Sequence, residues 1–228
     1  MGVRIEERLL EVRAGIAAAC AAAGRATTEV KLVAVSKKHP PERIREAYAA
    51  GQRDFGENYA QELRDKARAL SDLPEIRWHF IGRIQSNKAR YIVPLAIRVH
   101  AVDSVSHAQA LAKRAREAPV PCLVEVNLSL EATKAGATEA EALTLCEALH
   151  GIEGIDLKGL MTMPPYVHDP EVVAPLFARL AHLAAEGRRR GLPLHELSMG
   201  MTVDYPVAIR HGATWVRIGT AIFGPREG

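Results

Sequence analysis

Eight short runs rich in apolar and β-branched residues recur along the 228 residues, and stretches with helical periodicity separate them. The runs span residues 30–36, 54–57, 77–82, 98–103, 121–128, 157–163, 196–200 and 214–219. Strands that alternate with helices in this way predict βαβ units and a parallel sheet. Several runs are apolar throughout, as is typical of strands that are buried on both faces. Eight such units in about 200 residues favour a compact (β/α)8 barrel of the TIM type, with an open doubly wound sheet as the alternative.

The segments between the runs carry signals for the start and end of helices. Residues 41–51 begin with proline and end with glycine, residues 103–117 open with a cap-like aspartate or serine, and residues 137–151 end on glycine. An amphipathic stretch precedes the first run, and we expect it to form an extra N-terminal helix packed on the barrel. No linker or low-complexity segment divides the chain, so residues 1–228 are expected to form a single domain.

Charge and cysteine content disfavour several classes of protein. The net charge of +3 is mild, and the basic cluster 188–190 lies near a predicted helix end, where cations suit the helix dipole. We therefore expect no nucleic-acid binding. Cys20, Cys122 and Cys146 lie far apart without CxxC spacing, which indicates reduced thiols and no metal site. The N-terminal residues 1–24 resemble neither a signal peptide nor a membrane span, so we expect a cytoplasmic protein.

Two adjacent lysines, Lys37 and Lys38, follow the first strand-like run. In a (β/α)8 barrel the functional residues lie at the carboxyl ends of the strands, so this pair falls at the predicted mouth. Successive strand residues point to opposite faces, and only one of the two lysines can therefore face the mouth. Both faces of this run are apolar, so parity does not identify the inward lysine. A pair of solvated loop lysines is the alternative.

The last two strand-like runs predict a phosphate site. Residues 197–212 read as a strand end that leads into a helix capped by Thr202, and Gly200 would let the backbone approach a ligand closely. Free amides at a helix N-terminus attract anions. Gly219 and Thr220 again place a glycine and a hydroxyl at a strand end, and barrels commonly bind phosphate after strands seven and eight. We expect a phosphate site across the mouth from the lysine, with two ordinary capped turns as the alternative.

A lysine and a phosphate site at one mouth suggest a phosphorylated carbonyl compound held as a Schiff base. Two ligand classes fit, a sugar phosphate as in a Schiff-base aldolase and pyridoxal 5′-phosphate (PLP). Arg217 precedes Gly219 by two residues and therefore points to the same side of its strand. A guanidinium has little to bind beside the carbon chain of a sugar, but it could donate to the pyridine nitrogen of PLP. Arg217 therefore favours PLP.

Six segments of the chain resemble the family of pyridoxal phosphate homeostasis proteins. They are AVSKKHP, FGENYAQE, WHFIGRIQSNKAR, VEVNLSLEATKAG, KGLMTMPP and LSMGMTVDYPVAIRHGATWVRIGTAIFG, in order from residue 34 to residue 224. Members of that family are similar to the barrel domain of bacterial alanine racemase, which is PLP fold type III, and bind PLP on a single (β/α)8 barrel. The resemblance implies the same fold and cofactor here, and it disfavours the aldolase.

The resemblance also implies roles for residues near the lysine pair. Lys37 matches the lysine that forms the Schiff base, Lys38 would point away, and His39 replaces a lysine that commonly precedes the proline. Arg217 matches the arginine that faces the pyridine nitrogen in barrels of this kind. Lys134 belongs to a family motif, but the resemblance assigns it no role, and a solvated loop lysine is the alternative.

Further cofactor-binding residues follow from the same match. The resemblance implies that Met199 lies against the cofactor and that Asn58 and His79 line the mouth, although His79 could instead be a core histidine with satisfied hydrogen bonds. It places the phosphate on Ser198, Gly200, Gly219 and Thr220. We expect the two glycines to tolerate no side chain, because a Cβ would intrude on the anion.

Two features favour a carrier over an enzyme, and we expect no catalytic residues. A cation at the pyridine nitrogen disfavours protonation of that nitrogen, so the ring is a weaker electron sink. The resemblance implies that racemisation also needs a tyrosine from a second domain, which we expect this chain, ending at Gly228, to lack. The tyrosines at positions 59, 91, 166 and 205 match no such motif.

We therefore expect a monomeric PLP-binding protein with little or no turnover, which acts in intracellular PLP (vitamin B6) homeostasis and supplies PLP to apo PLP-dependent enzymes. The alternative is a PLP-dependent amino-acid racemase of low activity that uses Lys37 as one base.

Overall fold

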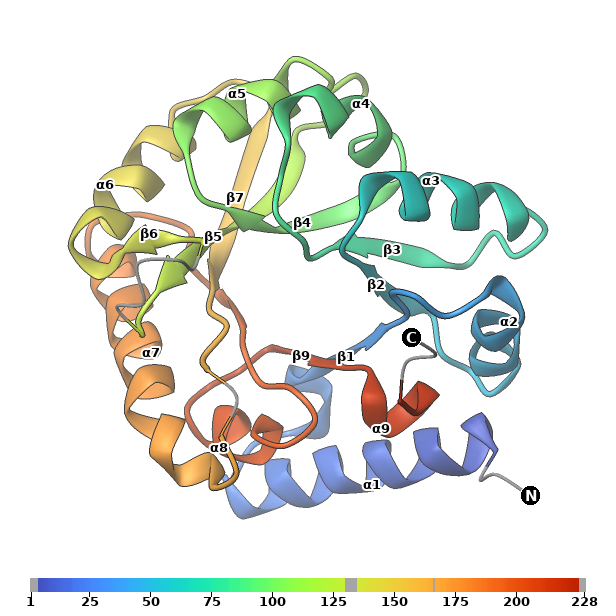
Figure 1. The fold of residues 1–228 in the computed structure, drawn as a ribbon. Coiled ribbons are helices and arrows are strands. Elements are labelled where there is room, and N and C mark those ends of the chain that lie inside the picture. Colours follow the sequence, from blue (N-terminus) through green and yellow to red (C-terminus); the bar gives the residue numbers. More distant parts are fainter. Residues whose placement is uncertain (1–3, 130–134, 166, 226–228) are drawn as a thin grey trace.

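Eight parallel strands close into a barrel in the computed structural model, which describes residues 4–129, 135–165 and 167–225 (Figure 1). The strands are β1 (Lys31–Val35), β2 (Asp54–Glu57), β3 (Arg77–Phe80), β4 (Ala96–Val102), β5 (Val120–Asn127), β7 (Ile155–Met161), β8 (Glu196–Ser198) and β9 (Trp215–Ile218). They pair in this order, and β9 pairs with β1 to close the ring. The short β6 (Ala137–Thr138) pairs with β5. Each predicted run overlaps one barrel strand, so the barrel is confirmed and the open sheet is wrong.

Helices surround the barrel, as the view along its axis in Figure 1 shows. The α-helices are α1 (Ile5–Ala22), α2 (Pro41–Ala49), α3 (Ala60–Ala69), α4 (Ala89–Ile92), α5 (Val105–Ala112), α6 (Glu139–His150), α7 (Ala174–Arg189), α8 (Tyr205–Arg210) and α9 (Thr220–Phe223). Short 3-10 helices span Thr27–Glu29, Ser86–Lys88 and Pro170–Val173. In the described part of the chain, none of these helices combines the length and the apolar character that a membrane span requires.

Helix α1 is the predicted extra element, and it packs against α2, α8 and α9. The last two helices are short, with 6 residues in α8 and 4 in α9. The long α1 lies along the side of the barrel where β9 meets β1 (Figure 1). Its buried side chains include Leu9, Val12 and Ile16, which recur at helical spacing. The N-terminal helix therefore covers a side of the barrel that the C-terminal helices are too short to cover alone.

The predicted helix signals hold at three helices and fail at the fourth. Pro41 is the first residue of α2, Ser104 caps α5 by accepting a hydrogen bond from the amide of His107, and α6 begins directly after Thr138. Helix α8 begins at Tyr205, so the predicted cap at Thr202 is wrong. The Asp204 carboxylate instead accepts a hydrogen bond of 2.5 Å from the Met201 amide, which closes a turn before the helix.

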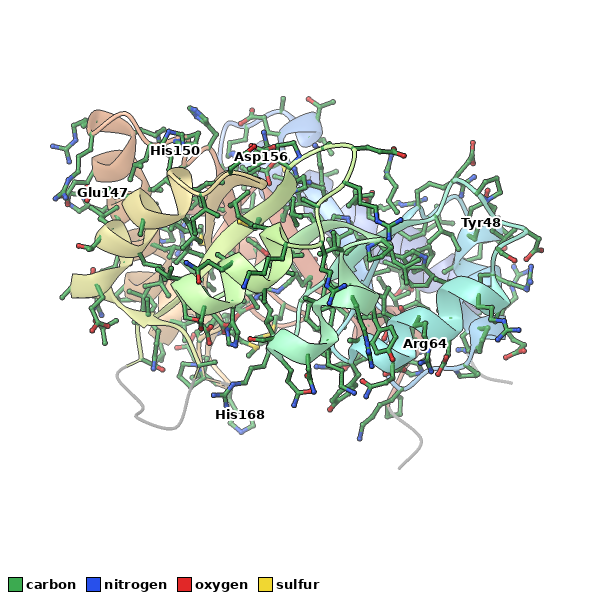
Figure 2. The ribbon with its side chains drawn as sticks, turned by 90° about the horizontal axis from the view of Figure 1, so that it is seen from above. Tyr48, Arg64, Glu147, His150, Asp156 and His168 are labelled. Carbon is green, nitrogen blue, oxygen red and sulfur yellow. The ribbon has the colours of Figure 1, made fainter. Side chains whose placement is uncertain are left out.

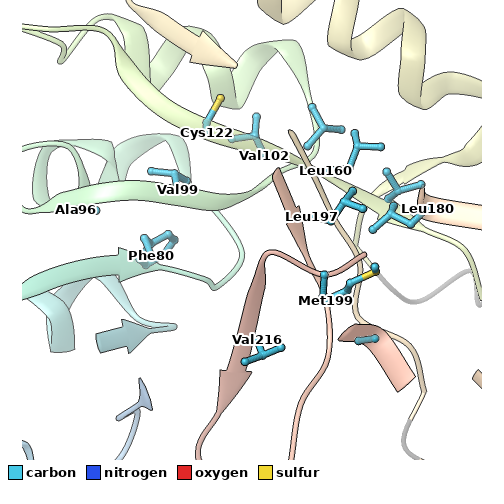
Figure 3. Close-up of a cluster of buried hydrophobic side chains, with 14 of the residues drawn as sticks. Phe80, Ala96, Val99, Val102, Cys122, Leu160, Leu180, Leu197, Met199 and Val216 are labelled. Atoms are coloured by element: carbon cyan, nitrogen blue, oxygen red, sulfur yellow. The ribbon is translucent and has the colours of Figure 1, made fainter. Parts of the chain in front are cut away.

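The main hydrophobic core lies between the barrel and its helices. Figure 3 shows part of this layer, where side chains from β3, β4, β5, β7, β8 and β9 meet those of the surrounding helices. Labelled members include Phe80, Val99, Leu160 and Leu180, all of them fully buried. The three cysteines are buried and free, and burial raises the pKa of the Cys122 and Cys146 thiols to about 12. Thiols with such a pKa stay protonated and unreactive at neutral pH.

The two ends of the barrel differ in function, because the strands are all parallel. Figure 2 turns the molecule by 90° and shows Asp156, near the start of β7, at one end and His168, which follows β7, at the other. The end with His168 is therefore the mouth, where the carboxyl ends of the strands meet and where barrels of this kind place their sites.

Candidate functional site

A cavity of ≈ 250 Å³ opens at the mouth of the barrel. Its lining comes from the ends of six strands and the loops that follow them: Val35, Lys37, His39, Asn58, Ile81, Met161, Met163, Val167, Met201, Thr202, Val203, Asp204, Arg217, Gly219 and Thr220. Five of the nine residues proposed from the sequence lie in this lining, and they come from segments more than 180 residues apart in the chain. They are Lys37, Asn58, Arg217, Gly219 and Thr220.

The lysine pair divides between the cavity and the solvent. Lys37 lines the cavity, whereas the Lys38 side chain is exposed. Lys38 adopts φ = 62°, in the left-handed region that residues with a Cβ seldom occupy. Its amide donates a hydrogen bond of 2.6 Å to Glu62 Oε1. Val35 and Lys37 both line the cavity, so the alternation of β1 continues as far as Lys37, and the turn at Lys38 ends it.

Gly219 and Thr220, which were expected to hold a phosphate across the mouth from the lysine, lie next to Lys37 instead. Strands β1 and β9 are neighbours, with Val33 opposite Arg217 and Ala34 opposite Ile218. Gly219 and Thr220 follow that register directly, and they lie beside the end of β1 that leads to Lys37. The expectation was wrong because the last strand of a closed barrel pairs with the first, a neighbour relation that a linear reading of the chain does not display.

Arg217 is a buried cation at the base of the cavity, with 5% of its surface exposed. It donates through Nη1 to Ser198 Oγ (2.6 Å) and through Nη2 to the carbonyl oxygen of Thr162 (3.0 Å). Burial lowers its pKa to about 10, while the nearby carboxylates of Glu125 and Asp204 act in the opposite direction. A guanidinium with this pKa remains charged at neutral pH, and two hydrogen bonds fix its plane.

Ser198 does not line the cavity, which corrects its expected contact with phosphate. Its hydroxyl is fully buried behind Arg217, from which it accepts a hydrogen bond. On its other side it lies 2.8 Å from His100 Nδ1. The residue points into the lumen of the barrel, one layer below the cavity floor, where it supports the arginine.

His79 is likewise a lumen residue and not part of the cavity lining. Its ring is fully buried, with Nδ1 2.9 Å from His100 Nε2 and Nε2 2.9 Å from Asp54 Oδ1. The alternative of a core histidine with satisfied hydrogen bonds is the correct one. The third residue of β3 lies too deep in the lumen to reach the mouth.

Together these contacts form a chain of hydrogen bonds down the lumen from Arg217 to Asp54. Burial lowers the pKa of His79 and puts that of His100 well below its usual value, so both rings are neutral. A neutral ring has one donor and one acceptor, and the ends of the chain fix the direction. Arg217 donates to Ser198, and Ser198 donates to His100. His100 then donates to His79, and His79 donates to the Asp54 carboxylate.

Met199 and Gly200 also lie outside the cavity lining. Met199 alternates with Ser198 along the chain, so it points outward, and it is fully buried in the apolar layer of Figure 3. Gly200 has φ = 96°, and a Cβ there would lie 2.7 Å from the Ala208 Cβ and 2.9 Å from the Tyr205 Cα. Packing against α8 therefore requires this glycine. The expectation that a Cβ would intrude on an anion is wrong for Gly200.

Gly219 does line the cavity, but a Cβ there would first meet β1. It would lie 3.0 Å from the Val35 carbonyl oxygen and 3.3 Å from the Val35 Cβ. A substitution at this position would therefore displace the strand that leads to Lys37.

Sequence reasoning missed several residues of the lining. His39 is buried, and its ring stacks on Phe223 with the centroids 5.1 Å apart. Met161 and Met163 lie where β7 ends, two residues apart and on one face of the chain. Their place at a strand end was visible in the sequence, but they were not proposed as cofactor-binding residues. Thr202 was assigned to a helix cap, although its place after a strand end could equally have indicated the cavity. Lys134 lies outside the described residues.

Comparisons with known proteins agree with this geometry. The family model of the alanine racemase N-terminal domain matches residues 12–227. A protein of Pseudomonas aeruginosa, the pyridoxal phosphate homeostasis protein, is 46% identical over 226 residues, which cover 98% of this chain and 96% of that protein. Among solved structures, PipY of Synechococcus elongatus with PLP bound is 39% identical, with a TM-score of 0.85 over 97% of this chain and 100% of PipY.

Alanine racemase from Corynebacterium glutamicum shares the fold at lower similarity. It is 20% identical with a TM-score of 0.69, and the match covers 94% of this chain and 61% of the racemase. The similarity to the racemase therefore concerns the barrel.

Proposed function

We propose that this chain, which belongs to the family of pyridoxal phosphate homeostasis proteins, binds PLP in the cavity at the barrel mouth. The observation that carries the proposal is the placement of Lys37 and Arg217 in the lining of one cavity, on adjoining strands. An amine and a buried guanidinium that line the same cavity suit a ligand with a carbonyl at one edge and a ring nitrogen at another. PipY, which is similar along the whole chain, has been solved with PLP bound.

Other features of the cavity fit the same ligand. Asn58 Oδ1 is buried without a hydrogen-bond partner among the described residues, so a polar group of a ligand could satisfy it. Thr202 and Thr220 place hydroxyls in the lining, and the first amides of α9 have no partner within that helix. Gly219 keeps the backbone accessible between them. These groups would hold the phosphate, and Met161, Met163 and Met201 would contact the ring.

When bound, PLP supplies an aldehyde whose carbon forms a C=N bond to a lysine nitrogen with loss of water, which gives a Schiff base. We propose Lys37 as that lysine. Arg217 would face the pyridine nitrogen, and its charge disfavours a proton there. In the described residues no tyrosine lines the cavity. We therefore propose storage and supply of PLP without useful turnover, by a cytoplasmic monomer that passes PLP to apo PLP-dependent enzymes.

Absorption spectroscopy with peptide mapping tests the proposal. The protein mixed with PLP should gain a visible absorption band that borohydride bleaches, and mass spectrometry should then find the pyridoxyl group on Lys37. Lys37→Ala should abolish the label, while Lys38→Ala, the matched control, should keep it. A protein that remains colourless with added PLP would refute the proposal.

One observation favours a slow amino-acid racemase as the second candidate. His39 lines the cavity together with Lys37, so two groups able to move a proton share it. We would incubate the PLP-loaded protein with L-amino acids in deuterated water and measure deuterium at Cα and the chirality of the product. Slow exchange without inversion supports the carrier. Rapid inversion that His39→Gln or Lys37→Ala abolishes would establish the racemase.

A further inference from the structure

A buried ionic cluster lies behind the cavity, on the outer face of β1 and β2. The ammonium group of Lys66, a residue of α3 with 5% of its surface exposed, is 2.7 Å from Glu57 Oε1 and 2.7 Å from Glu62 Oε1. Its third hydrogen bond, also 2.7 Å, goes to the carbonyl oxygen of Ser36. All three N–H donors of the lysine are therefore used, and Glu57 is fully buried at the end of β2. We name Glu57, Glu62 and Lys66 the acid–lysine cluster.

The cluster holds the backbone on both sides of Lys37. On the preceding residue, Ser36 Oγ donates to Glu57 Oε1 (2.6 Å), in addition to the contact between the Ser36 carbonyl and Lys66. On the following residue, the Lys38 amide donates to Glu62 Oε1 (2.6 Å). Three charge-assisted hydrogen bonds thus reach the two neighbours of the lysine that lines the cavity.

The conformation held in this way is one that the chain disfavours. Within the described residues, Lys38 is the one non-glycine residue with a positive φ. Val35 and Lys37 both line the cavity, and Ser36 between them is turned outward to Glu57, which fixes the parity that places Lys37 inside. The turn at Lys38 that ends this alternation has to be imposed by contacts, since a residue with a Cβ avoids the left-handed region.

A contribution to stability does not explain why these charged residues are buried. Burying charges is costly even when they are paired, and apolar side chains of similar volume would serve the core at least as well. Moreover, Glu57 Oε2 is buried without a hydrogen-bond partner. A fully satisfied structural network would not leave that oxygen unpaired. The contacts that the cluster does make converge on the segment around Lys37.

We propose that Glu57, Glu62 and Lys66 are positioning residues for Lys37, which select Lys37 over Lys38 for the cavity and hold it ready to bond a carbonyl ligand. This inference rests on the proposed function, in which Lys37 is the amine that bonds PLP. The cluster acts through the backbone of Ser36 and Lys38 and does not touch the ligand itself.

The test separates covalent bonding from occupation of the cavity. Lys66→Met removes all three contacts of the ammonium group, and Glu62→Ala removes the contact with the Lys38 amide. Glu196→Gln is the matched control, because Glu196 forms a partly buried ion pair with Arg98 and does not touch the Lys37 segment. For each protein we would measure the rate of covalent bonding after mixing with PLP, from the visible absorbance. We would also measure the affinity for pyridoxamine 5′-phosphate, which carries an amine in place of the aldehyde and cannot bond to lysine.

Both cluster variants should bond PLP more slowly by a factor of about 10 to 100, the loss that a small misplacement of a reacting group produces. Their affinity for pyridoxamine 5′-phosphate should stay near that of the wild type, which also shows that they are folded. After borohydride, part of the pyridoxyl label should move from Lys37 to Lys38. The control should match the wild type in all three measurements.

Two results would overturn the inference alone. One is unchanged bonding to Lys37 in both variants, and the other is a parallel loss of pyridoxamine 5′-phosphate binding, which would indicate general damage to the cavity. A wild-type protein that binds PLP without bonding to Lys37 would instead refute the proposed function, and this inference would fall with it.

Discussion

The lumen of the barrel and the layer between barrel and helices are built from the same strands, yet their chemistry is opposite. On β3, Phe80 points into the apolar layer, while the adjacent His79 points into the lumen and hydrogen-bonds at both ring nitrogens. Barrels of this kind usually fill the lumen with bulky branched side chains. Here much of it consists of paired polar groups, which include the chain from Arg217 to Asp54 and the ion pair of Arg98 with Glu196.

The apolar layer mainly stabilises the fold, whereas the polar lumen fixes the geometry of the site. Apolar burial has no direction, so the layer can stabilise the barrel in many arrangements of similar volume. A hydrogen-bond chain has a direction and one partner at each step, so it fixes the orientation of every member. We therefore expect substitutions of apolar residues in the layer to change stability alone, and substitutions in the hydrogen-bond chain from Arg217 to Asp54 to change ligand binding as well.

The largest expected effect on stability is in the layer. Phe177 of α7 is fully buried, and Phe177→Ala should lower the free energy of unfolding by about 3–5 kcal/mol, because it removes a large apolar side chain and leaves a cavity. Urea unfolding would measure this loss. The dissociation constant for PLP, determined where the variant is folded, should hardly change. A large loss of affinity would show that the layer also orients the site.

A smaller loss of stability with a larger effect on binding is expected in the lumen. His100→Leu leaves Ser198 and His79 without their partner, and each unsatisfied buried group costs about 1–3 kcal/mol. Arg217 would also lose the fixed acceptor that orients its guanidinium. PLP should therefore bind more weakly to the folded variant, as equilibrium titration would measure. Unchanged affinity would contradict the division between lumen and layer.

The two buried histidines of the lumen should make the stability depend on pH. The folded-state pKa of His79 and His100 lies below the usual value of 6.5, so as the pH falls below about 6.5 the unfolded state binds protons first. The free energy of unfolding should therefore decrease from about pH 6.5 downward. Replacing both histidines with glutamine should flatten this slope.

Glu57 contributes a slope of opposite sign. Burial raises its pKa from 4.5 to about 7, against the effects of Lys66 and Ser36, while Glu62 adds to the rise. Between these values the folded state binds the extra proton, so this group favours the fold as the pH falls from 7 to 4.5. The histidine contribution is therefore measured best in a Glu57→Gln background. A slope that persists there after both histidine replacements would have another origin.

The smallest effect should follow a volume-conserving exchange in the layer. Leu160 is fully buried on β7, and Leu160→Met should cost less than about 1.5 kcal/mol and leave PLP binding unchanged. Ser198→Ala in the lumen removes a single oxygen but interrupts the chain behind Arg217. If thermal unfolding and PLP titration showed similar effects for the two substitutions, the contrast between the regions would not hold.

The periodic features of the sequence were sufficient to predict the fold. All eight strands, the extra helix and the glycine at the end of α6 follow from local patterns and from the number of units. At the site, Lys37 and Arg217 were identifiable because strand parity and position at a strand end can both be read from the chain.

The remaining site residues depend on depth and closure, which local sequence does not encode. Whether His79 or Ser198 reaches the mouth depends on how far each strand runs and on the tilt of the strands around the ring. Ser198 and Met199 were both assigned to the cofactor from the family motif, although adjacent residues of a strand point to opposite faces. The selection of Lys37 over Lys38 depends on Glu62, 24 residues later, through a hydrogen bond to a backbone amide.

The position of α1 has a consequence for the order of events during synthesis. The apolar face of α1 leaves the ribosome well before its partners α8 and α9, which are made nearly 200 residues later. Until then Leu9, Val12 and Ile16 lack the surface that buries them, and β1 lacks β9. Contacts between such distant segments slow folding and leave apolar surface exposed meanwhile. The apolar face of α1 should therefore be open to chaperones until β9 has emerged, and closing the barrel should be a late step in folding.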